Sequence, residues 1–295
     1  MGGFYETPQA FDRALKKAIA SAGGDRGERY RQMLRDRFLC RVFSSGDNEL
    51  VLKGGSGLLA RIPDARATRD IGFGHGGRAD ADAVLEKLNA AVSCDLGDWC
   101  RFELTRCEES LDENGYSRLL KLRYSTRIGD EEKDPILIDL SLDCATTLPP
   151  ERIEPASRIA VEGIETCGYL VYPLPDQLAD KLCAIMELQL GGWPSSRTKD
   201  LVDVVFYATN ERFDLRELSH AVWAECARRD MVVPERFAAP EAWKRGFAAF
   251  AKKSGVPTEY ASFEAASALA SAFFNPALAA SVDNLVWDPG SLTWR

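Results

Sequence analysis

The chain has 295 residues, of which 45% are hydrophobic and 28% are charged, and its formal net charge is −8. This length suits one large or two modest domains with a proper hydrophobic core. The acidic balance argues against a protein that coats nucleic acid without sequence preference, because such binding depends on neutralising phosphates, but it leaves room for a local basic groove.

The sequence also argues against a membrane protein and against a zinc or disulfide framework. No apolar run approaches the roughly 20 residues that a membrane-spanning helix needs, and residues 1–20 mix charges without a signal-peptide core. The eight cysteines include no C-x-x-C pair, and the chain has only two histidines, His75 and His220. We therefore expect reduced, buried thiols in a cytoplasmic protein.

Residues 8–43 predict two helices separated at residues 22–25, and the second helix is rich in arginine. Two interpretations of these arginines stay open: a solvated helix face, or one wall of an RNA-binding groove beside the motif that follows. The arginines are Arg26, Arg29, Arg31, Arg35, Arg37 and Arg41.

Residues 49–73 carry the clearest pattern in the chain. A short apolar run ends on Lys53, a glycine turn leads into a helical-looking segment, and a predicted strand at residues 67–73 then carries Asp70. A strand, a glycine turn and a helix start aim backbone N–H groups at an anion. Lys53 adds a point charge suited to phosphate, and Asp70 supplies the hard oxygen that Mg²⁺ takes beside phosphates. The turn consists of Gly54, Gly55 and Ser56.

Three strand-like runs follow. Residues 100–105 alternate in polarity and lead through a polar hairpin loop into residues 116–127, where Lys121, Arg123 and Arg127 share one face. These cations are either ordinary solvent-exposed side chains or a track for a phosphate backbone, and both interpretations stay open. The loop at residues 74–77 is predicted to be a flexible turn, with His75 more often idle than functional in such a place.

Residues 135–143 form the most apolar predicted strand, with Asp139 in its middle. A carboxylate in the middle of a central strand is expensive to bury unless it is paired or bound to a cation. Asp139 is therefore the first candidate for a functional carboxylate here. Asp143, on the same face near the end of the strand, is the alternative. Residues 159–161 and 169–172 predict short edge strands.

The second half of the chain reads as helical. Pro175 and Asp176 predict the start of a helix that runs to about residue 190 and leaves Lys181 off its apolar stripe. In the next helix Asp200 and Asp203 lie three residues apart on one face. Three amphipathic helices follow, at residues 215–229, 242–253 and 263–274, and the tail is predicted to be irregular. The expected core aromatics are Trp223, Trp243, Phe247 and Phe250.

Taken in order, these pieces resemble the AbiEii/AbiGii-type nucleotidyltransferase toxins of bacterial toxin–antitoxin systems, a branch of the DNA polymerase β-like nucleotidyltransferases. That family shows a K-G-G turn entering a helix, a T-x-D strand with a second aspartate, a later strand carboxylate, a helical lysine and a K-D-x-x-D segment. The matches span roughly residues 49–210. They are Lys53-Gly54-Gly55, Thr68-Arg69-Asp70-Ile71, Asp139, Lys181 and Lys199-Asp200 with Asp203.

The resemblance implies a fold and a reaction. The fold would be a mixed α/β nucleotidyltransferase domain at residues 1–172 followed by a helical domain at residues 173–295, with the active site in the cleft between them. The reaction would move a nucleoside monophosphate from an NTP to an RNA 3′-hydroxyl, with Mg²⁺ as the cofactor. A tRNA acceptor end is the implied substrate and a cognate antitoxin the implied partner.

The resemblance also assigns roles to residues. Asp70 and Asp139 would hold Mg²⁺, and Asp139 would activate the hydroxyl. Lys181 would contact phosphate and Asp200 would orient neighbouring cations. Thr68 stands where some antitoxins of this kind phosphorylate a hydroxyl. The implied nucleotide-binding residues are Lys53, Gly54, Gly55, Ser56, Arg69, Arg197 and Lys199.

Gly72 departs from the family pattern, since it stands where the family has its second aspartate. Positions 70 and 72 of a strand share a face, which lets a D-x-D pair hold two metal ions. Two explanations stay open: the natural protein works with an incomplete site, or the sequence was altered to silence a toxic enzyme. A second hypothesis for the whole chain is a non-catalytic module of this fold that binds nucleotide, RNA or the antitoxin.

Overall fold

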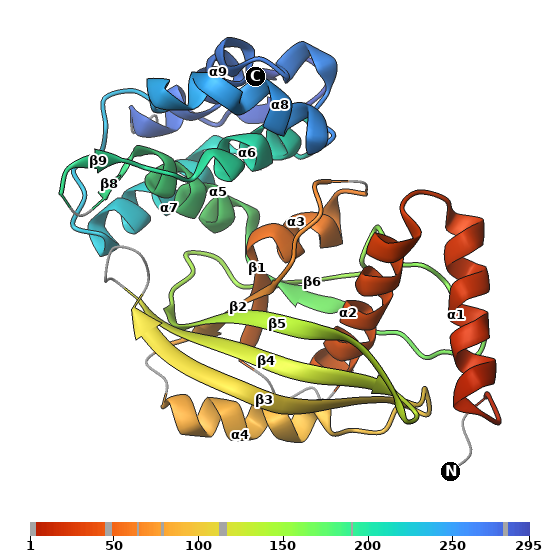
Figure 1. Ribbon diagram of the computed structural model, residues 1–295. Coiled ribbons are helices and arrows are strands. Elements are labelled where there is room, and N and C mark those ends of the chain that lie inside the picture. The colour runs from red at the N-terminus through yellow and green to blue at the C-terminus, as the bar shows by residue number, and fades with distance from the viewer. Residues whose placement is uncertain are drawn as a thin grey trace.

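The computed structural model describes residues 4–44, 49–63, 65–77, 80–111, 117–189, 191–279 and 283–295. These residues form a mixed sheet flanked by helices and, beside it, a mostly helical part (Figure 1). The predicted mixed α/β fold class is confirmed. No helix within the described ranges has both the length and the apolar character needed to cross a membrane.

The main sheet has the strand order β3-β4-β5-β2-β1-β7-β6. Strands β3, β4 and β5 form an antiparallel meander, β2 runs parallel to β5, and β1 pairs antiparallel with β2 and parallel with β7. Its strands are β1 (Leu50–Lys53), β2 (Ile71–Gly76), β3 (Cys100–Leu111), β4 (Arg118–Ile128), β5 (Glu131–Cys144), β6 (Glu151–Ile153) and β7 (Tyr169–Val171).

Three local expectations about these strands were wrong. Strand β2 begins only at Ile71, so Asp70 lies in the bend before it, and the strand continues through His75, which was expected in a turn. The His75 side chain pairs with Glu49 at 2.9 Å across the β1–β2 edge. Residues 159–161 form no strand. Strand β7 lies between β1 and β6 and is therefore not an edge strand, since β6 takes the edge of the sheet.

The helices divide between the two parts of the chain (Figure 1). In the first part they are α1 (Pro8–Ala22), α2 (Arg26–Ser44), α3 (Gly54–Arg61) and α4 (Ala81–Val92). In the second part they are α5 (Leu174–Met186), α6 (Thr198–Asn210), α7 (Leu215–Arg228), α8 (Lys244–Lys253) and α9 (Phe263–Leu278). A small hairpin, β8 (Leu188–Gln189) with β9 (Trp193–Pro194), joins α5 to α6.

The C-terminal tail is ordered into strands, contrary to the irregular tail that was expected. Strand β11 (Val286–Asp288) pairs antiparallel with β10 (Phe213–Asp214) on one side and with β12 (Thr293–Trp294) on the other. The reason is Trp287, which is fully buried and donates its indole N–H to the Ala208 carbonyl at 2.7 Å. Among the four aromatic residues expected in this core, Trp243 and Phe247 are buried, whereas Trp223 and Phe250 are exposed.

Two apolar cores hold the chain together. One lies between the main sheet and helices α1, α2 and α4, and the other lies among α5 to α9. Helix α3 contributes to both, because Leu58 packs into the helical core and Ala60 into the core under the sheet. The short α3 therefore links the two parts at the place where the glycine turn begins.

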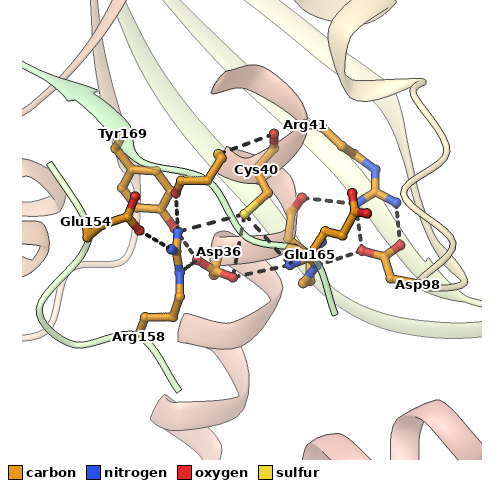
Figure 2. A network of polar contacts seen from close by, with 10 residues as sticks. Asp36, Cys40, Arg41, Asp98, Glu154, Arg158, Glu165 and Tyr169 are labelled. Carbon is orange, nitrogen blue, oxygen red and sulfur yellow. Dashed lines mark hydrogen bonds and ion pairs between the residues drawn. The ribbon is translucent and has the colours of Figure 1, made fainter. Parts of the chain in front are cut away.

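Two arginines of α2 are neither a solvated face nor a groove wall, because Arg37 and Arg41 are fully buried. Both bind the buried carboxylate of Asp98: Arg37 donates from Nε at 2.7 Å and Arg41 from Nη1 at 2.9 Å (Figure 2). Burial alone would raise the pKa of Asp98, but the hydrogen bonds and charges of Arg41 and Arg37 lower it. The three groups fix α2 against the chain that enters β3.

The same helix is tied to the approach to β7 by a second polar group. Arg158 donates to the Asp36 carboxylate from Nε at 2.8 Å, and the Tyr169 hydroxyl also binds Asp36 (Figure 2). Arg158 further pairs with Glu154 at 2.9 Å. These contacts hold together segments more than 120 residues apart in sequence, which no local pattern could have indicated.

Removing the Asp98 carboxylate should strongly destabilise the fold. The variant Asp98→Ala leaves two buried guanidinium groups without their carboxylate, so we expect the free energy of unfolding in urea to fall by about 3–5 kcal/mol. The control is Glu28→Ala, which removes the partly exposed partner of Arg31 and should cost less than about 1 kcal/mol. Equal losses in the two variants would contradict this account of the buried network.

Candidate active site

A cavity of about 400 Å³ lies between the sheet and helices α5, α6 and α7. Both parts of the chain contribute to its walls, as the cleft in the sequence-based expectation required. The predicted site residues that line it are Lys53, Gly54, Gly55, Thr68, Asp70, Asp139, Lys181, Arg197, Lys199 and Asp200. Ser56 and Arg69 are not among the lining residues.

Three carboxylates line the sheet side of the cavity, those of Asp70, Asp139 and Asp143. Asp139 lies on β5, next to the strand that follows Asp70. Burial and the negative charge of Asp70 raise the pKa of Asp139, against the opposing effect of three cations, Lys121, Lys199 and Arg197. Asp139 is therefore more basic than an ordinary aspartate. The alternative, Asp143, also lines the cavity, and it accepts a hydrogen bond from the Arg118 backbone N–H at 3.3 Å.

Gly72 sits between Lys53 of β1 and Asp139 of β5 in the sheet register. A Cβ atom added at Gly72 would lie 2.8 Å from the Lys53 carbonyl oxygen, closer than real Cβ contacts. Because that oxygen belongs to the backbone, any larger residue at position 72 requires β1 to shift. The glycine therefore does more than omit a carboxylate, since it lets the two strands approach.

The glycine turn presents less free backbone than the sequence pattern indicates. Gly54 has φ +66°, in the left-handed region that favours glycine. Its N–H donates to the Gln177 side chain of α5 at 3.1 Å, so this amide is already satisfied. Lys53 remains on the cavity wall, with its ammonium 5.7 Å from the centre of the Tyr172 ring. The charge of Lys53 is thus the main feature that this turn offers to an anion.

Two hydroxyls hold Asp70 in place. The Ser56 hydroxyl donates to the Asp70 carbonyl at 2.9 Å, and the buried Thr68 hydroxyl donates to the Asp70 carboxylate at 2.8 Å. Ser56 was expected to bind nucleotide, but it is buried behind Asp70 and supports its backbone. Arg69 is exposed and lies outside the cavity lining, so no contact in the structure supports its expected role.

Lys181 lies at the centre of a buried group of charges. It lies off the apolar stripe of α5 but is only 3% exposed, so it is not a solvated surface lysine. Its ammonium donates to Asp200 at 3.0 Å and to Asp203 at 2.6 Å. Burial alone would lower the pKa of Lys181, but the carboxylates of Asp203 and Asp200 raise it. The ammonium is thus charged and already paired, and its expected phosphate contact stays a prediction.

Two arginines complete this group. Arg66 donates from Nη2 to Asp203 at 2.8 Å, and Arg197 donates from Nε to Asp200 at 2.7 Å. Arg66 comes from the segment just before Thr68, so the group joins that segment to α6. The sequence did not indicate a site role for Arg66, because its partner Asp203 lies 137 residues away. Its position two residues before Thr68 was the only local signal.

A second charged group on the helical side was also missed. Arg229 follows α7 and pairs with Asp180 of α5, with Glu187 at 3.1 Å and with Glu225 at 2.6 Å. Asp180 would have its pKa raised by burial, but the charges of Lys53 and Arg229 lower it. Arg228 also lines the cavity. The sequence signal fades beyond residue 210, so these arginines could be placed only by packing.

The raised pKa of Asp139 predicts the effect of pH on stability. Between the ordinary value of 3.8 and its raised value, the folded chain binds more protons than the unfolded chain. The free energy of unfolding therefore falls as pH rises through that window. The variant Asp139→Asn should be more stable than the unaltered chain at pH 7, and the difference should shrink as pH falls through that window toward 3.8.

The measurement is urea unfolding from pH 3 to pH 8, with Asp134→Asn as the control. Asp134 lies on the same strand with a side chain that is 60% exposed, so its replacement should change stability by less than about 0.5 kcal/mol. If Asp139→Asn were less stable than the unaltered chain at neutral pH, the folded state would not disfavour the charged form of Asp139, and this explanation would be wrong.

Comparison with known proteins agrees with this geometry. The family model described as "Nucleotidyl transferase AbiEii toxin, Type IV TA system" matches residues 37–269. The solved structure of MenT4, a nucleotidyltransferase toxin from Mycobacterium tuberculosis, is similar, with a TM-score of 0.55 and 18% identity over 94% of this chain and 91% of that chain. At this identity the likeness is one of fold. No curated protein matches the chain.

Two further structures, both from Helicobacter pylori, are more distantly similar. JHP933 matches with a TM-score of 0.41 and 14% identity over 84% of this chain and 91% of that chain. A putative nucleotidyltransferase matches with a TM-score of 0.40 and 16% identity over 70% of this chain and 82% of that chain.

Proposed function

This chain belongs to the AbiEii family of nucleotidyltransferase toxins from type IV toxin–antitoxin systems, and we propose that it transfers a nucleoside monophosphate from an NTP to the 3′-hydroxyl of an RNA. The acceptor class that we propose is tRNA. One observation carries the proposal: two neighbouring carboxylates, Asp70 and Asp139, face a wall of cations across one cavity. Such an arrangement suits the transfer of a phosphoryl group, whose negative charge the cations stabilise.

In the proposed reaction, the RNA hydroxyl lies beside Asp139 and attacks the α-phosphorus of the NTP. Asp139 takes the hydroxyl proton, the new bond joins the RNA 3′-oxygen to the α-phosphorus, and the bond to the β-phosphate breaks so that pyrophosphate leaves. The raised pKa of Asp139 supports its role as the base, because it holds a proton more readily than an ordinary aspartate. Lys53, Arg197 and Lys199 are proposed to hold the phosphates from the walls of the cavity.

The proposed cofactor is Mg²⁺, held by Asp70 and Asp139. Within the described ranges, no group of three or more His, Cys, Asp or Glu side chains is placed to hold a metal ion. Two carboxylates still fit, because Mg²⁺ is commonly bound by one or two carboxylates with water and substrate phosphates. The repulsion between Asp70 and Asp139, visible in the raised pKa of Asp139, is what a cation between them would relieve. When bound, the ion would neutralise charge on the reacting phosphates.

In the proposed enzyme, Gly72 is a native residue, and the site has one carboxylate fewer than the family pattern. The close approach of the Lys53 carbonyl supports that choice, since the strands pack around the glycine. Asp70, Asp139, Lys53 and Asp200 remain together on the cavity wall, which favours an active enzyme over a non-catalytic binding module. The second metal ligand of the family pattern is thus replaced by substrate phosphates or water.

Thr68 is the proposed point of control by a cognate antitoxin. Its hydroxyl donates to the Asp70 carboxylate, so a phosphate on Thr68 would remove that donor. It would also place a charge of about −1.5 to −2 beside Asp70. Repulsion between these anions would disturb the carboxylate and the NTP phosphates, which accounts physically for inactivation by phosphorylation at this position.

The proposal is tested by following labelled nucleoside monophosphate from each of the four NTPs into total tRNA. We expect transfer by the unaltered chain and a fall in kcat of about 10²–10⁴-fold in Asp139→Asn, because the base is lost. The matched control is Asp143→Asn, on the same strand and cavity wall, which should keep most of the activity. The opposite order would make Asp143 the base, and nucleotide binding without any transfer would favour the binding module.

Binding of Mg²⁺ can be measured without activity. If Asp70 and Asp139 hold the ion, MgCl₂ should raise the thermal unfolding temperature of the unaltered chain, and an ion at one hundred times its Kd adds about 2.7 kcal/mol of stability. The rise should disappear with EDTA and in Asp70→Asn, and it should persist in Asp143→Asn. A rise of equal size in Asp70→Asn would place the ion elsewhere.

A further inference from the structure

The outer face of the β3–β4–β5 meander carries a run of exposed cations. Along β4 the side chains of Lys121, Arg123 and Arg127 are exposed, whereas the alternate residues Leu122, Tyr124 and Thr126 are buried against the core and Ser125 is half-buried. Arg101 of β3 is exposed and lies opposite Arg127 in the register. We call Arg101, Lys121, Arg123 and Arg127 the basic sheet face.

The basic sheet face does not stabilise the fold through charge pairing. Among the described residues, none of its four side chains makes a hydrogen bond or an ion pair. The register also places Arg101 directly opposite Arg127, and Arg106 opposite Arg123. Like charges that face each other across a sheet are destabilising. The side chains of this face are thus able to meet an external anion.

Acidic residues on the same face do not cancel these charges. Glu108 is paired with Arg106, and both lie on the outer strand β3. Glu103 and Glu132 are exposed on the face as well. Glu132 lies directly opposite Arg127 in the register and Glu108 lies opposite Lys121, but among the described residues no ion pair joins these carboxylates to the basic sheet face. The four cations therefore remain available along one strand and its neighbour, and an anion that follows β4 meets three of them in succession.

The basic sheet face is continuous with the cavity. Lys121 lies opposite Asp139 in the register and lines the cavity. Beside it, Arg123 lies opposite Leu137, which is 38% exposed. An exposed apolar side chain between cations offers a contact for a ribose or a base. Residues two apart on a strand are roughly 6.6–6.8 Å apart, a spacing that suits successive phosphates of an extended strand.

We propose that the basic sheet face binds the sugar–phosphate backbone of the acceptor RNA and leads its 3′ end past Lys121 to Asp139. This inference rests on the proposed function, because it assumes an RNA acceptor. Its path starts at Arg101 and Arg127, passes Arg123 and enters the cavity beside the carboxylates. The sequence left two interpretations open for the cations of β4, ordinary solvent-exposed side chains or a track for a phosphate backbone. The proposal favours the phosphate track. Continuity with the cavity favours RNA over an acidic protein as the occupant.

The test compares two double variants that each remove two charges. Arg123→Gln/Arg127→Gln alters the basic sheet face, and Lys252→Gln/Lys253→Gln alters two exposed lysines at the end of α8. The affinity of total tRNA is measured at several salt concentrations. We expect the sheet variant to bind at least about tenfold more weakly, with a salt slope smaller by about 1.4, since each phosphate contact on a single strand contributes about 0.7. The α8 variant should bind as the unaltered chain does.

Kinetics separate this role from a structural one. The sheet variant should raise the KM for tRNA and leave kcat and the KM for the NTP unchanged, as expected when only uniform binding is lost. Its thermal unfolding temperature should change little, because the variant relieves the facing like charges of Arg101 with Arg127 and of Arg106 with Arg123 while it removes the facing opposite charges of Arg127 and Glu132. Equal tRNA affinity in the sheet variant and the unaltered chain would overturn the inference, as would a loss confined to the α8 variant.

Two further outcomes keep this inference apart from the proposed function. If the unaltered chain transfers nucleotide, and the sheet variant transfers nucleotide and binds tRNA equally well, the proposed function stands and the RNA track is refuted. Salt-dependent tRNA binding that needs Arg123 and Arg127, without transfer from any NTP, would support the track and refute the function. Competition by polyglutamate as strong as by tRNA would overturn the choice of RNA and indicate an acidic protein as the partner.

Discussion

The ammonium of Lys181, held between the carboxylates of Asp200 and Asp203, is the interaction on which the cavity depends. A charge with 3% exposure is tolerated only when its partners are close and correctly oriented. That requirement fixes α5 against α6 at one distance and one register. Arg66 extends the group to the segment before Asp70, so the segment that carries Asp70 is tied to the packing of the helices. The two parts of the chain meet through charge as well as through α3.

The pairing of cations on the helical wall also shapes the chemistry. Arg197 and Arg229 are held by carboxylates of their own elements or neighbouring ones, so they are oriented before any ligand enters. Preorganised charges stabilise a reacting phosphate without first having to reorient. On the sheet side the opposite holds, because Asp70 and Asp139 repel each other and together invite a cation. Among the described residues, the cavity thus has arginines held in ion pairs on its helical wall and the carboxylates of Asp70 and Asp139 without ion pairs on its sheet wall.

Gly72 shows how one small residue acts on both strand packing and ligand chemistry. An aspartate at position 72 would restore the pair of carboxylates in the family pattern. In this chain it would also meet the Lys53 carbonyl at 2.8 Å from its Cβ atom and force β1 outward. Because Lys53 itself lies on the cavity wall, any shift of β1 changes the position of its charge in the cavity. The two effects of position 72 cannot be separated in this sheet.

The sequence by itself indicated the main helices, most strands of the main sheet and some of the carboxylates and cations that line the cavity, because alternation, helical periodicity and motif order are local properties. Asp139 on β5 is the clearest example. It did not determine that Arg37 and Arg41 are buried, that Ser56 supports Asp70, or that Arg66 pairs with Asp203. Only the tertiary structure decided these points, since the partner of a buried charge is set by packing between segments that are distant in sequence.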